Sequence, residues 1–344
     1  MPGYPNLLSW IEAGYAGNMD YFANRQQAYE HPRGVLEGAK SVIALAYPYD
    51  AADPLPVASG QGMIARYVWS GVDYHDIIHP KLKQLCQILL SESPESRARG
   101  VVDTAPLLER EIAKQAGLGW TGKNTLLLNK HQGSYFFLAC VLSNLQMPYD
   151  QPHETSHCGT CRACLDACPT QAFPEPGVLD ASRCISYLTI EHRDAIPVGL
   201  RDDIGDWLFG CDICQEVCPW NHKTTQRATR PDSALDTLEL SQLFQWNEEE
   251  FRQRFRKTPL WRTRRSGILR NAAIVLGNQK CESGLPALTL GLRDEQAGVR
   301  GASAWALGKI GGDRAIMTLK SRRSAERDPN VLEEIDMALS LHHQ

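Results

Sequence analysis

Eight of the eleven cysteines of this chain lie between residues 158 and 218. They form one group with the spacing C-x2-C-x2-C-x3-C-P and a second group with the spacing C-x2-C-x3-C-P, and one further cysteine lies between the two groups. Cysteines clustered in this way in a chain of ordinary length indicate metal or redox chemistry rather than a disulfide framework. In chain order the eight are Cys158, Cys161, Cys164, Cys168, Cys184, Cys211, Cys214 and Cys218.

The first spacing is that of bacterial two-cluster [4Fe-4S] proteins, in which three close cysteines hold one cluster and the fourth reaches the other cluster. Zinc sites instead use two separated C-x2-C pairs for each ion, so we expect iron and sulfur and one-electron transfer. Cross-ligation assigns cluster one to Cys158, Cys161, Cys164 and Cys218. Cluster two then takes Cys168, Cys184, Cys211 and Cys214, where Cys184 replaces the missing first cysteine of the second group.

The other three cysteines, Cys86, Cys140 and Cys281, lie far apart in the sequence and are expected to be small buried hydrophobes. The net charge of -4 excludes a globally basic nucleic-acid binder, so any such contact must come from a local basic surface. The sequence shows no signal peptide, no twin-arginine signal and no run of about 20 apolar residues. We therefore expect a soluble, cytoplasmic protein without a membrane segment.

The order of patterns along the 344 residues predicts a multidomain α+β protein. Residues 1–150 mix helical stretches with strand-like runs such as 41–47 and 101–102, which predicts an α/β domain. A helix is expected from Pro106 to Ala116, stopped by Gly117. Residues 151–225 are expected to form a ferredoxin-like domain with two clusters, and residues 226–261 a connector that ends in a charged helix.

The C-terminal part, residues 262–344, contains a repeat. The segment 267–277 recurs as 298–308 with small residues at the same places, and a weaker third copy spans 331–339. A period near 30 residues is typical of stacked helical pairs, each too small to bury its own apolar face. We expect a short array of HEAT-like repeats.

One motif is a false lead. The segment 117–124 matches a phosphate-binding loop except at its last position, where Asn124 replaces the Ser or Thr that would meet magnesium. The segment also follows a predicted helix and leads into an apolar run, whereas a phosphate loop follows a strand and opens a helix. Nucleotide hydrolysis is therefore not expected.

Together, the motifs resemble the epoxyqueuosine reductase family over nearly the whole chain. The resemblance is carried by the cysteine pattern, by the terminal repeats and by the ordered segments 101–106, 117–124, 184–192 and 209–221. It implies an enzyme that removes the epoxide oxygen of epoxyqueuosine at the tRNA wobble position and so forms queuosine. It further implies a nitroreductase-like N-terminal domain that binds cobalamin and receives electrons from the clusters.

Cobalamin itself is implied only by the resemblance. The common base-off signature is absent, since Asp73-Tyr-His75 is followed by Asp76-Ile-Ile78. Family members reach the first segment of this chain only after further residues, so an N-terminal strand and helix are expected to be missing. The resemblance also implies a monomer, an anticodon stem-loop as partner and an external low-potential electron donor.

The resemblance assigns the role of proton donor to Asp103. Burial between an apolar strand and a corrinoid would favour the protonated form of this carboxyl group near neutral pH. From the residues alone, an aspartate that caps backbone amides in a turn is an equally good interpretation. Tyr74 and His75 are possible pocket-lining groups. The cofactor contacts implied by position are Arg66, Asp103, Asn124, Ser134, Ser186, Asp212 and Ile213.

A basic segment at the start of the repeats is the expected tRNA surface, because cations interleaved with aromatic residues can bind phosphates and stack on bases. A solvated helical face is the alternative. The cations of this basic segment are Arg252, Arg254, Arg256, Lys257, Arg262, Arg264, Arg265 and Arg270, and its aromatic residues are Phe251, Phe255 and Trp261.

Two other functions fit part of the sequence. A cobalamin-dependent reductive dehalogenase also combines a corrinoid with two clusters, but it usually carries an export signal and lacks terminal repeats. A non-enzymatic iron-sulfur electron carrier would show cluster absorption without corrin bands.

Overall fold

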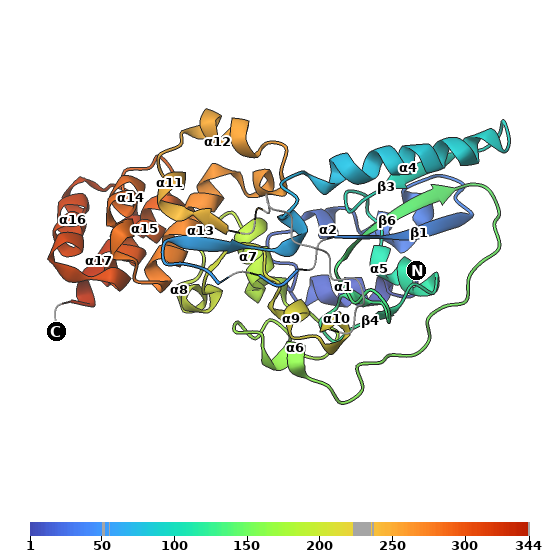
Figure 1. Ribbon diagram of the computed structural model, residues 1–344, viewed down its shortest axis with the longest axis horizontal. Coiled ribbons are helices and arrows are strands. Elements are labelled where there is room, and N and C mark those ends of the chain that lie inside the picture. The colour runs from blue at the N-terminus through green and yellow to red at the C-terminus, as the bar shows by residue number, and fades with distance from the viewer. Residues whose placement is uncertain (50–51, 55, 223–234, 236, 343–344) are drawn as a thin grey trace. The chain divides into compact units, whose positions relative to one another are not determined.

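The computed structural model describes residues 1–49, 52–54, 56–222, 235 and 237–342 (Figure 1). Contacts along the chain divide it into two compact units, each assembled from separate segments. The N-terminal unit comprises Met1–Ala52, Val72–Ser182 and Asp212–Pro231, and the repeat unit comprises Asp53–Gly71, Arg183–Cys211 and Asp232–Gln344. The predicted functional division at residues 150, 225 and 261 stays a prediction, and its boundary at 225 lies outside the described residues.

The N-terminal unit is built on an antiparallel three-stranded sheet in the order β1-β6-β3. The expected strand at residue 41 is confirmed as β1 (Ser41–Pro48), and the apolar run before residue 143 forms the central strand β6 (Phe136–Ser143). Strand β3 (Ala98–Val101) completes the sheet. Within β6, Val141 and Leu142 are fully buried, which explains why this strand reads as a continuous apolar run.

Helix α4 (Tyr74–Ser91) packs against β3 and β6 and is the long helix beside the sheet in Figure 1. It begins at Asp73, whose side chain accepts a hydrogen bond from the amide of His75. A Cβ atom on Gly100 of β3 would lie 2.7 Å from Cβ of Leu82, so glycine lets the helix lie close to the sheet.

The predicted helix from Pro106 begins later than expected. Helix α5 spans Glu109–Gln115, because the backbone turns at 103–107 and Leu108 has a non-helical ψ of 71°. Its predicted end is confirmed, since Gly117 has a φ of +75°, a conformation that glycine adopts at low cost.

The cysteine segments of the N-terminal unit have little regular structure. They contain the single helical turns α6 (Ala163–Asp166), α9 (Ile213–Glu216) and α10 (Pro219–His222). Strands β4 (Trp120–Thr121) and β5 (Leu127–Leu128) form a small hairpin that carries residues 122–126 at its turn. The remaining elements of this unit are α1 (Tyr4–Glu12), α2 (Tyr21–Asn24), α3 (Gln26–Glu30) and the 3-10 helix η1 (Pro32–Gly34).

The repeat unit opens with a small mixed sheet. Strand β2 (Gln61–Ile64) pairs parallel with β7 (Trp207–Phe209) and antiparallel with β8 (Thr237–Glu239). The predicted charged helix is α12 (Glu248–Phe255). The other short helices along this unit are α7 (Ile185–Ile190), α8 (Val198–Arg201) and α11 (Leu240–Leu243). Its 3-10 helices are η2 (Arg66–Val68), η4 (Asp202–Ile204), η5 (Pro259–Thr263) and η6 (Glu282–Gly284). The 3-10 helix η3 (Ala181–Arg183) spans the point in the sequence where the N-terminal unit gives way to the repeat unit.

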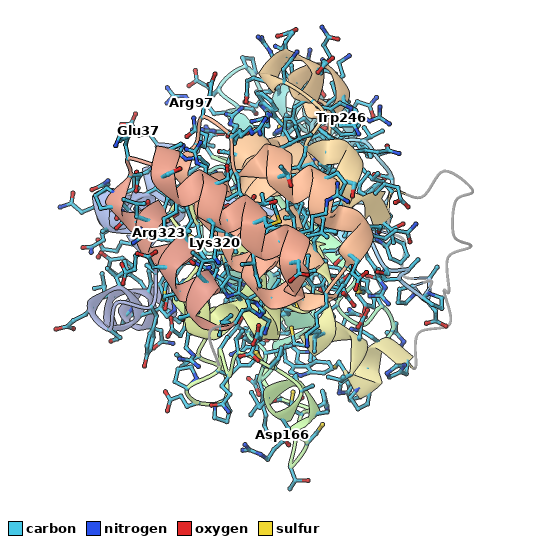
Figure 2. All side chains as sticks on the ribbon, turned by 90° about the vertical axis from the view of Figure 1, so that its left-hand side faces the viewer. Glu37, Arg97, Asp166, Trp246, Lys320 and Arg323 are labelled. Carbon is cyan, nitrogen blue, oxygen red and sulfur yellow. The ribbon has the colours of Figure 1, made fainter. Side chains whose placement is uncertain are left out.

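The predicted helical repeats are confirmed. Their helices are α13 (Arg264–Asn278), α14 (Leu285–Gly291), α15 (Ala297–Ile310), α16 (Gly312–Ala325) and α17 (Pro329–Ser340). Helix α15 packs between α13 and α17, and Figure 2 looks onto this end of the array, with Lys320 and Arg323 on α16.

The small residues of the repeat motif permit this close packing. A Cβ atom on Gly277 of α13 would lie 2.9 Å from Cα of Ala306 on α15, and one on Gly308 of α15 would lie 2.9 Å from Cα of Ala338 on α17. The same glycine-to-alanine approach therefore occurs twice, one repeat apart. The equivalent sequence positions thus make equivalent contacts, as expected of stacked repeats.

The predictions for the three separate cysteines differ in outcome. Cys140 and Cys281 are buried as expected, whereas Cys86 is half-buried on α4. Among the described residues, no helix has both the length and the apolar character needed to cross a membrane.

Candidate functional site

The four cysteines assigned to cluster one come together in the N-terminal unit. Cys158, Cys161, Cys164 and Cys218 line a cavity of about 190 Å³. The cavity is also lined by residues of the β4-β5 hairpin and of the cysteine segments, namely Lys123, Asn124, Leu128, His157, Ala163, Pro219 and Trp220. The spacing of the first motif and the last cysteine of the second motif therefore converge as cross-ligation predicts.

The thiols that line this cavity lie close enough to affect one another. Burial raises the pKa of the Cys164 thiol, and the neighbouring Cys218 and Cys158 raise it further, so the three sulfur atoms lie close enough to interact. Four thiols spread around a cavity fit a [4Fe-4S] cluster, whose iron and sulfur atoms would fill the space between them.

Lys123 fastens the first cysteine segment to the hairpin turn. Its Nζ donates hydrogen bonds to the carbonyl oxygens of Gly159 and Cys161 at 2.7 and 2.8 Å. The lysine of the apparent phosphate loop therefore binds the cysteine segment, and the segment 117–124 leads into strand β5 rather than a helix. In the sequence, Lys123 stands out only as part of the segment that resembles a phosphate-binding loop, and that pattern does not indicate its contact with the cysteine segment.

Asn124 and Ser134 hold the second cysteine segment. The side-chain amide of Asn124 donates to the carbonyl of Cys214 at 3.3 Å. Ser134 Oγ accepts hydrogen bonds from the side-chain amides of Gln215 and Asn221 at 2.9 and 3.0 Å. Both predicted cofactor contacts are thus nearly buried and engaged in positioning cysteines. Nothing in the sequence indicates these contacts of Gln215 and Asn221, apart from their position shortly after Cys214 and Cys218.

The ligands assigned to cluster two belong to different units. Cys168 and Cys214 lie in the N-terminal unit, whereas Cys184 and Cys211 lie in the repeat unit. The Sγ of Cys168 accepts a hydrogen bond from the amide of Ala172 at 3.4 Å, an interaction that favours a thiolate ligand. Cys184 precedes helix α7 as its N-cap residue. The assignment of these four cysteines to one cluster stays a prediction from spacing.

Asp103 lies on a turn after β3, in a backbone conformation unusual for a residue with a side chain. Its φ is 45°, in the left-handed region, which costs free energy unless the surroundings hold it in place. The Tyr74 hydroxyl donates to Oδ2 of Asp103, and Nε2 of His75 lies 3.0 Å from Oδ1. Tyr74 and His75, which the sequence offered only as possible pocket-lining groups, thus lie beside Asp103. The Asp103 side chain is 36% exposed, and its burial against a corrinoid stays a prediction.

Glu109 of α5 completes this arrangement. Its Oε1 accepts a hydrogen bond from the amide of Asp103 at 2.8 Å. Burial raises the pKa of Glu109 to about 7, although the bond from the Asp103 amide opposes the shift. Asp103 does not cap a helix amide with its own side chain here. Instead another carboxyl group holds its backbone, which leaves both oxygens of Asp103 for Tyr74 and His75.

The other predicted cofactor contacts are distributed over both units. Asp212 is nearly buried and precedes α9, and Ile213 is the first residue of that helix. In the repeat unit, Arg66 is 4% exposed, with its guanidinium 5.4 Å from the centroid of the Trp69 ring, and Ser186 lies on α7. Their contact with cobalamin stays a prediction.

The structure corrects part of the predicted tRNA surface. Arg270 is 2% exposed and donates to the carbonyl oxygens of Leu188, His192 and Asp194 at 2.7 to 2.8 Å. Burial lowers its pKa to about 10. Arg270 therefore joins α13 to α7 and to the residues that follow α7, and it is not available to phosphate.

Three more residues of that segment make contacts within the repeat unit and are not free to bind tRNA. Arg265 forms an ion pair with Asp294 at 2.8 Å and is largely covered. Phe251 and Phe255 are buried, so they do not stack on bases. The helical period explains the error, because every fourth residue of an amphipathic helix faces the core even when its neighbours are charged.

The remaining cations are exposed. Arg254 lies over Trp246 and Arg264 over Trp261, with guanidinium-to-centroid distances of 4.7 and 4.3 Å. In the described part of the chain, Arg256 and Lys257 have no ion-pair partner. The exposed set is Arg252, Arg254, Arg256, Lys257, Arg262 and Arg264, and we call it the basic surface.

Comparison with family models divides the chain into three parts. Residues 157–221 match a 4Fe-4S double cluster binding domain, and residues 260–340 match HEAT repeats. Residues 30–104 match the model described as "Epoxyqueuosine reductase QueG, DUF1730". The fold and the cysteine cavity thus define an iron-sulfur oxidoreductase with a HEAT-repeat extension.

Curated relatives identify the family. The chain is 46% identical to epoxyqueuosine reductase of Pseudomonas aeruginosa over 280 residues, which cover 79% of this chain and 77% of the relative. It is 40% identical to epoxyqueuosine reductase of Escherichia coli over 281 residues, which cover 80% of this chain and 74% of the relative. The chain belongs to the epoxyqueuosine reductase family.

Solved structures of epoxyqueuosine reductases also match this chain. A crystal structure of epoxyqueuosine reductase with an epoxyqueuosine-modified tRNA stem loop matches with a TM-score of 0.88 and 34% identity, over 98% of this chain and 91% of the other. A Bacillus subtilis epoxyqueuosine reductase, whose aspartate catalytic loop is swung out of the active site, matches with a TM-score of 0.86, the same identity and the same coverage.

Proposed function

We propose that this enzyme removes the epoxide oxygen of epoxyqueuosine in tRNA and so forms queuosine, the last step of queuosine biosynthesis. The observation that carries the proposal is the convergence of a four-cysteine cavity and a held aspartate, Asp103, in a chain of the epoxyqueuosine reductase family. A reductive dehalogenase or a plain electron carrier would not account for the matching relatives.

Two [4Fe-4S] clusters supply the electrons. Cluster one is held by the four cysteines of the cavity, and cluster two by Cys168, Cys184, Cys211 and Cys214. An external low-potential donor reduces them one electron at a time. The thiolates fix each cluster, and the Lys123 and Asn124 hydrogen bonds fix the segments that carry the thiolates.

A nitroreductase-like N-terminal domain is proposed to bind cobalamin, with Arg66, Asp103, Asn124, Ser134, Ser186, Asp212 and Ile213 as its contacts. When bound, cobalamin supplies a reduced cobalt centre that passes electrons to the substrate. The residues fit this role in part. Asp103 and its two partners present an exposed acid group, whereas Asn124 and Ser134 already bond the second cysteine segment.

Asp103 is proposed to protonate the oxygen as it leaves carbon. A carboxyl group within hydrogen-bond reach of a leaving oxygen lowers the barrier by transferring a proton in the transition state. The left-handed backbone of Asp103, held by Glu109, fixes where the carboxyl group points. The Bacillus subtilis relative, with an aspartate on its catalytic loop, supports this assignment.

The basic surface is proposed to bind the anticodon stem-loop. Its cations lie on α12, directly after α12, on η5 and at the first residue of α13. Arg256 and Lys257 lack competing carboxylates in the described residues. A relative solved with a modified tRNA stem loop supports the choice of partner. Such a substrate places the enzyme in the cytoplasm, where we expect it to act as a monomer.

The test of the reaction is anaerobic. The reconstituted enzyme is incubated with epoxyqueuosine-containing tRNA, cobalamin and a strong reductant, and the nucleosides are then measured by mass spectrometry. Loss of one oxygen mass is expected for the wild type, and Asp103→Asn should abolish it while keeping the iron content. An unchanged nucleoside mass with the fully loaded wild-type enzyme would overturn the proposal.

The test of the tRNA surface compares two double variants. Arg256→Ala/Lys257→Ala should weaken binding and reduce the slope of log Kd against log salt by about one to two, since each phosphate contact adds about 0.7 to 0.9. Arg314→Ala/Lys320→Ala on α16 removes the same charge elsewhere and should bind like the wild type. Equal binding by both variants contradicts this surface.

A further inference from the structure

The start of α4 carries a continuous chain of three polar groups that ends at Asp103. Nδ1 of His75 lies 2.7 Å from Oδ1 of Asp73, and Nε2 of His75 lies 3.0 Å from Oδ1 of Asp103. An imidazole donates from both nitrogens only when it carries a second proton. The ring of His75 therefore lies between two carboxyl groups in the arrangement that suits the imidazolium form.

The surroundings of His75 favour the same form. The bond to Asp103 is the largest effect and raises its pKa to about 9, although partial burial opposes the shift and Asp73 adds to it. The rings of Tyr74 and His79 stack beside it at centroid distances of 4.3 and 5.6 Å. The His75 side chain is 22% exposed, so solvent reaches it.

Other titratable groups near α4 are engaged elsewhere. On β6 the titratable residue is Cys140, which lies in a different core cluster from the one under α4. On β3 it is Arg99, whose guanidinium donates to the carbonyl of Val35 at 2.8 Å. Glu109 of α5 binds the amide of Asp103 rather than the imidazole.

Both oxygens of Asp103 are held from α4, Oδ2 by the Tyr74 hydroxyl and Oδ1 by His75. Consecutive residues at a helix start thus fix the orientation of the carboxyl group, while Asp73 fixes the tautomer and orientation of the imidazole. A second carboxyl group behind a histidine has this effect in other proton-transfer sites.

The chemistry of the proposed reaction requires more than one proton. Both carbon-oxygen bonds of the epoxide break, a carbon-carbon double bond forms, and the oxygen leaves as water. This takes two electrons, which the clusters deliver from the external reductant, and two protons. One carboxyl group gives one proton and must then be protonated again before the oxygen can leave as water.

We propose that His75 is the positioning residue that orients Asp103 and returns a proton to it during turnover. This inference rests on the proposed function. Asp103 is ionised beside the imidazolium. For each of the two protons, His75 passes its Nε2 proton to Oδ1 of Asp103, and Asp103 gives that proton to the oxygen, first as a carbon-oxygen bond breaks and again as water leaves. The imidazole then regains a proton from solvent, while Asp73 holds the ring in place.

The first experiment follows the reaction. His75→Gln should lower kcat about 100-fold with little change in KM for tRNA, a size typical of lost proton transfer. In the wild type kcat should fall as the pH rises through about 9, and in His75→Gln this fall should be absent. Added imidazole should partly restore kcat in His75→Ala. The matched control, His131→Gln, changes an exposed histidine outside the site and should behave like the wild type.

The second experiment needs no substrate. An NMR titration of the histidine side chains should show His75 protonated to about pH 9, and Asp73→Asn should lower that value. A His75 that titrates near its ordinary value of 6.5, or a His75→Gln enzyme with wild-type kcat and pH profile, would overturn the inference. Failure of the proposed function looks different, because then the wild-type enzyme itself leaves the epoxide intact.

Discussion

The cysteine cavity and the helical repeats are held together in opposite ways. Around the cavity, short turns such as α6 and α9 are fixed by side-chain hydrogen bonds from Lys123 and Asn124 to backbone carbonyls. In the repeats, long helices pack through glycine and alanine with hardly any side chain between the backbones. In Figure 2, Asp166 is labelled on the short turn α6, and Lys320 and Arg323 are labelled on the repeat helix α16.

The difference shows what stabilises each region. A segment with little apolar surface relies on bonds to its cluster and on a few polar anchors, so it gains order when the cluster binds. A helical repeat gains stability from contact area alone and tolerates change at its exposed positions. Substitutions should therefore act through cofactor content in the first region and through unfolding free energy in the second.

The largest effect is expected at a cluster ligand. Cys164→Ala should remove cluster one, because three thiolates hold a cubane far less firmly, and so reduce the iron content by about half and abolish turnover. Iron and sulfide analysis with electron paramagnetic resonance checks this. The control Cys86→Ala, on α4 away from the cavity, should keep all the iron. Full cluster content in Cys164→Ala would contradict the ligand assignment.

The next effect concerns the repeats. Gly308→Ala places a Cβ atom 2.7 Å from Cβ of Ala338, so α15 and α17 must move apart. We expect a loss of about 1 to 3 kcal/mol in unfolding free energy, as for other overpacked cores. Gly298→Ala on the same helix meets no atom within 4 Å and should be neutral or slightly stabilising. Denaturant unfolding measures both, and equal stability of the two variants would refute the tight-contact interpretation.

A third prediction uses the pKa of His75, raised from 6.5 to about 9. A raised histidine pKa stabilises the folded state fully below pH 6.5, and this contribution is lost as the pH rises to about 9. His75→Gln should therefore be less stable than the wild type by about 2 kcal/mol at pH 6, with the gap shrinking by pH 9.5. A gap independent of pH would show that only packing was lost.

The smallest effect is expected at Lys123. Lys123 lines the cluster-one cavity and its ammonium group binds the carbonyl oxygens of Gly159 and Cys161, so its positive charge stabilises the reduced and more negative cluster. Lys123→Met should lower the reduction potential of cluster one by about 30 to 60 mV, up to about tenfold in the one-electron equilibrium. A redox titration measures the shift. Lys130→Met, an exposed lysine after β5, is the control.

Local patterns in the sequence predicted several features that the structure confirms. The cysteine spacing brought four thiols to one cavity, and the repeated segments became α13, α15 and α17. Strand β1 begins at the expected residue. In each case the signal is a pattern of residue types in the sequence, namely a fixed cysteine spacing, a repeated segment or an apolar run.

Other features depended on the tertiary structure. The charge pattern suggested that Arg270 was free, yet carbonyls from residues 188–194, distant in sequence, surround it. The segment 117–124 resembles a phosphate-binding loop in its residues but not in its structure. Lys123 binds the first cysteine segment because that segment folds against the hairpin turn.

The sequence alone determined that this chain holds thiols for two clusters and stacks helices through small residues, because both depend on residue types at short, fixed intervals. Only the tertiary structure decided that Asp103 is held by Tyr74, His75 and Glu109. The reason is physical, since hydrogen-bond partners are chosen by distance in space, and three separate segments meet at this carboxyl group.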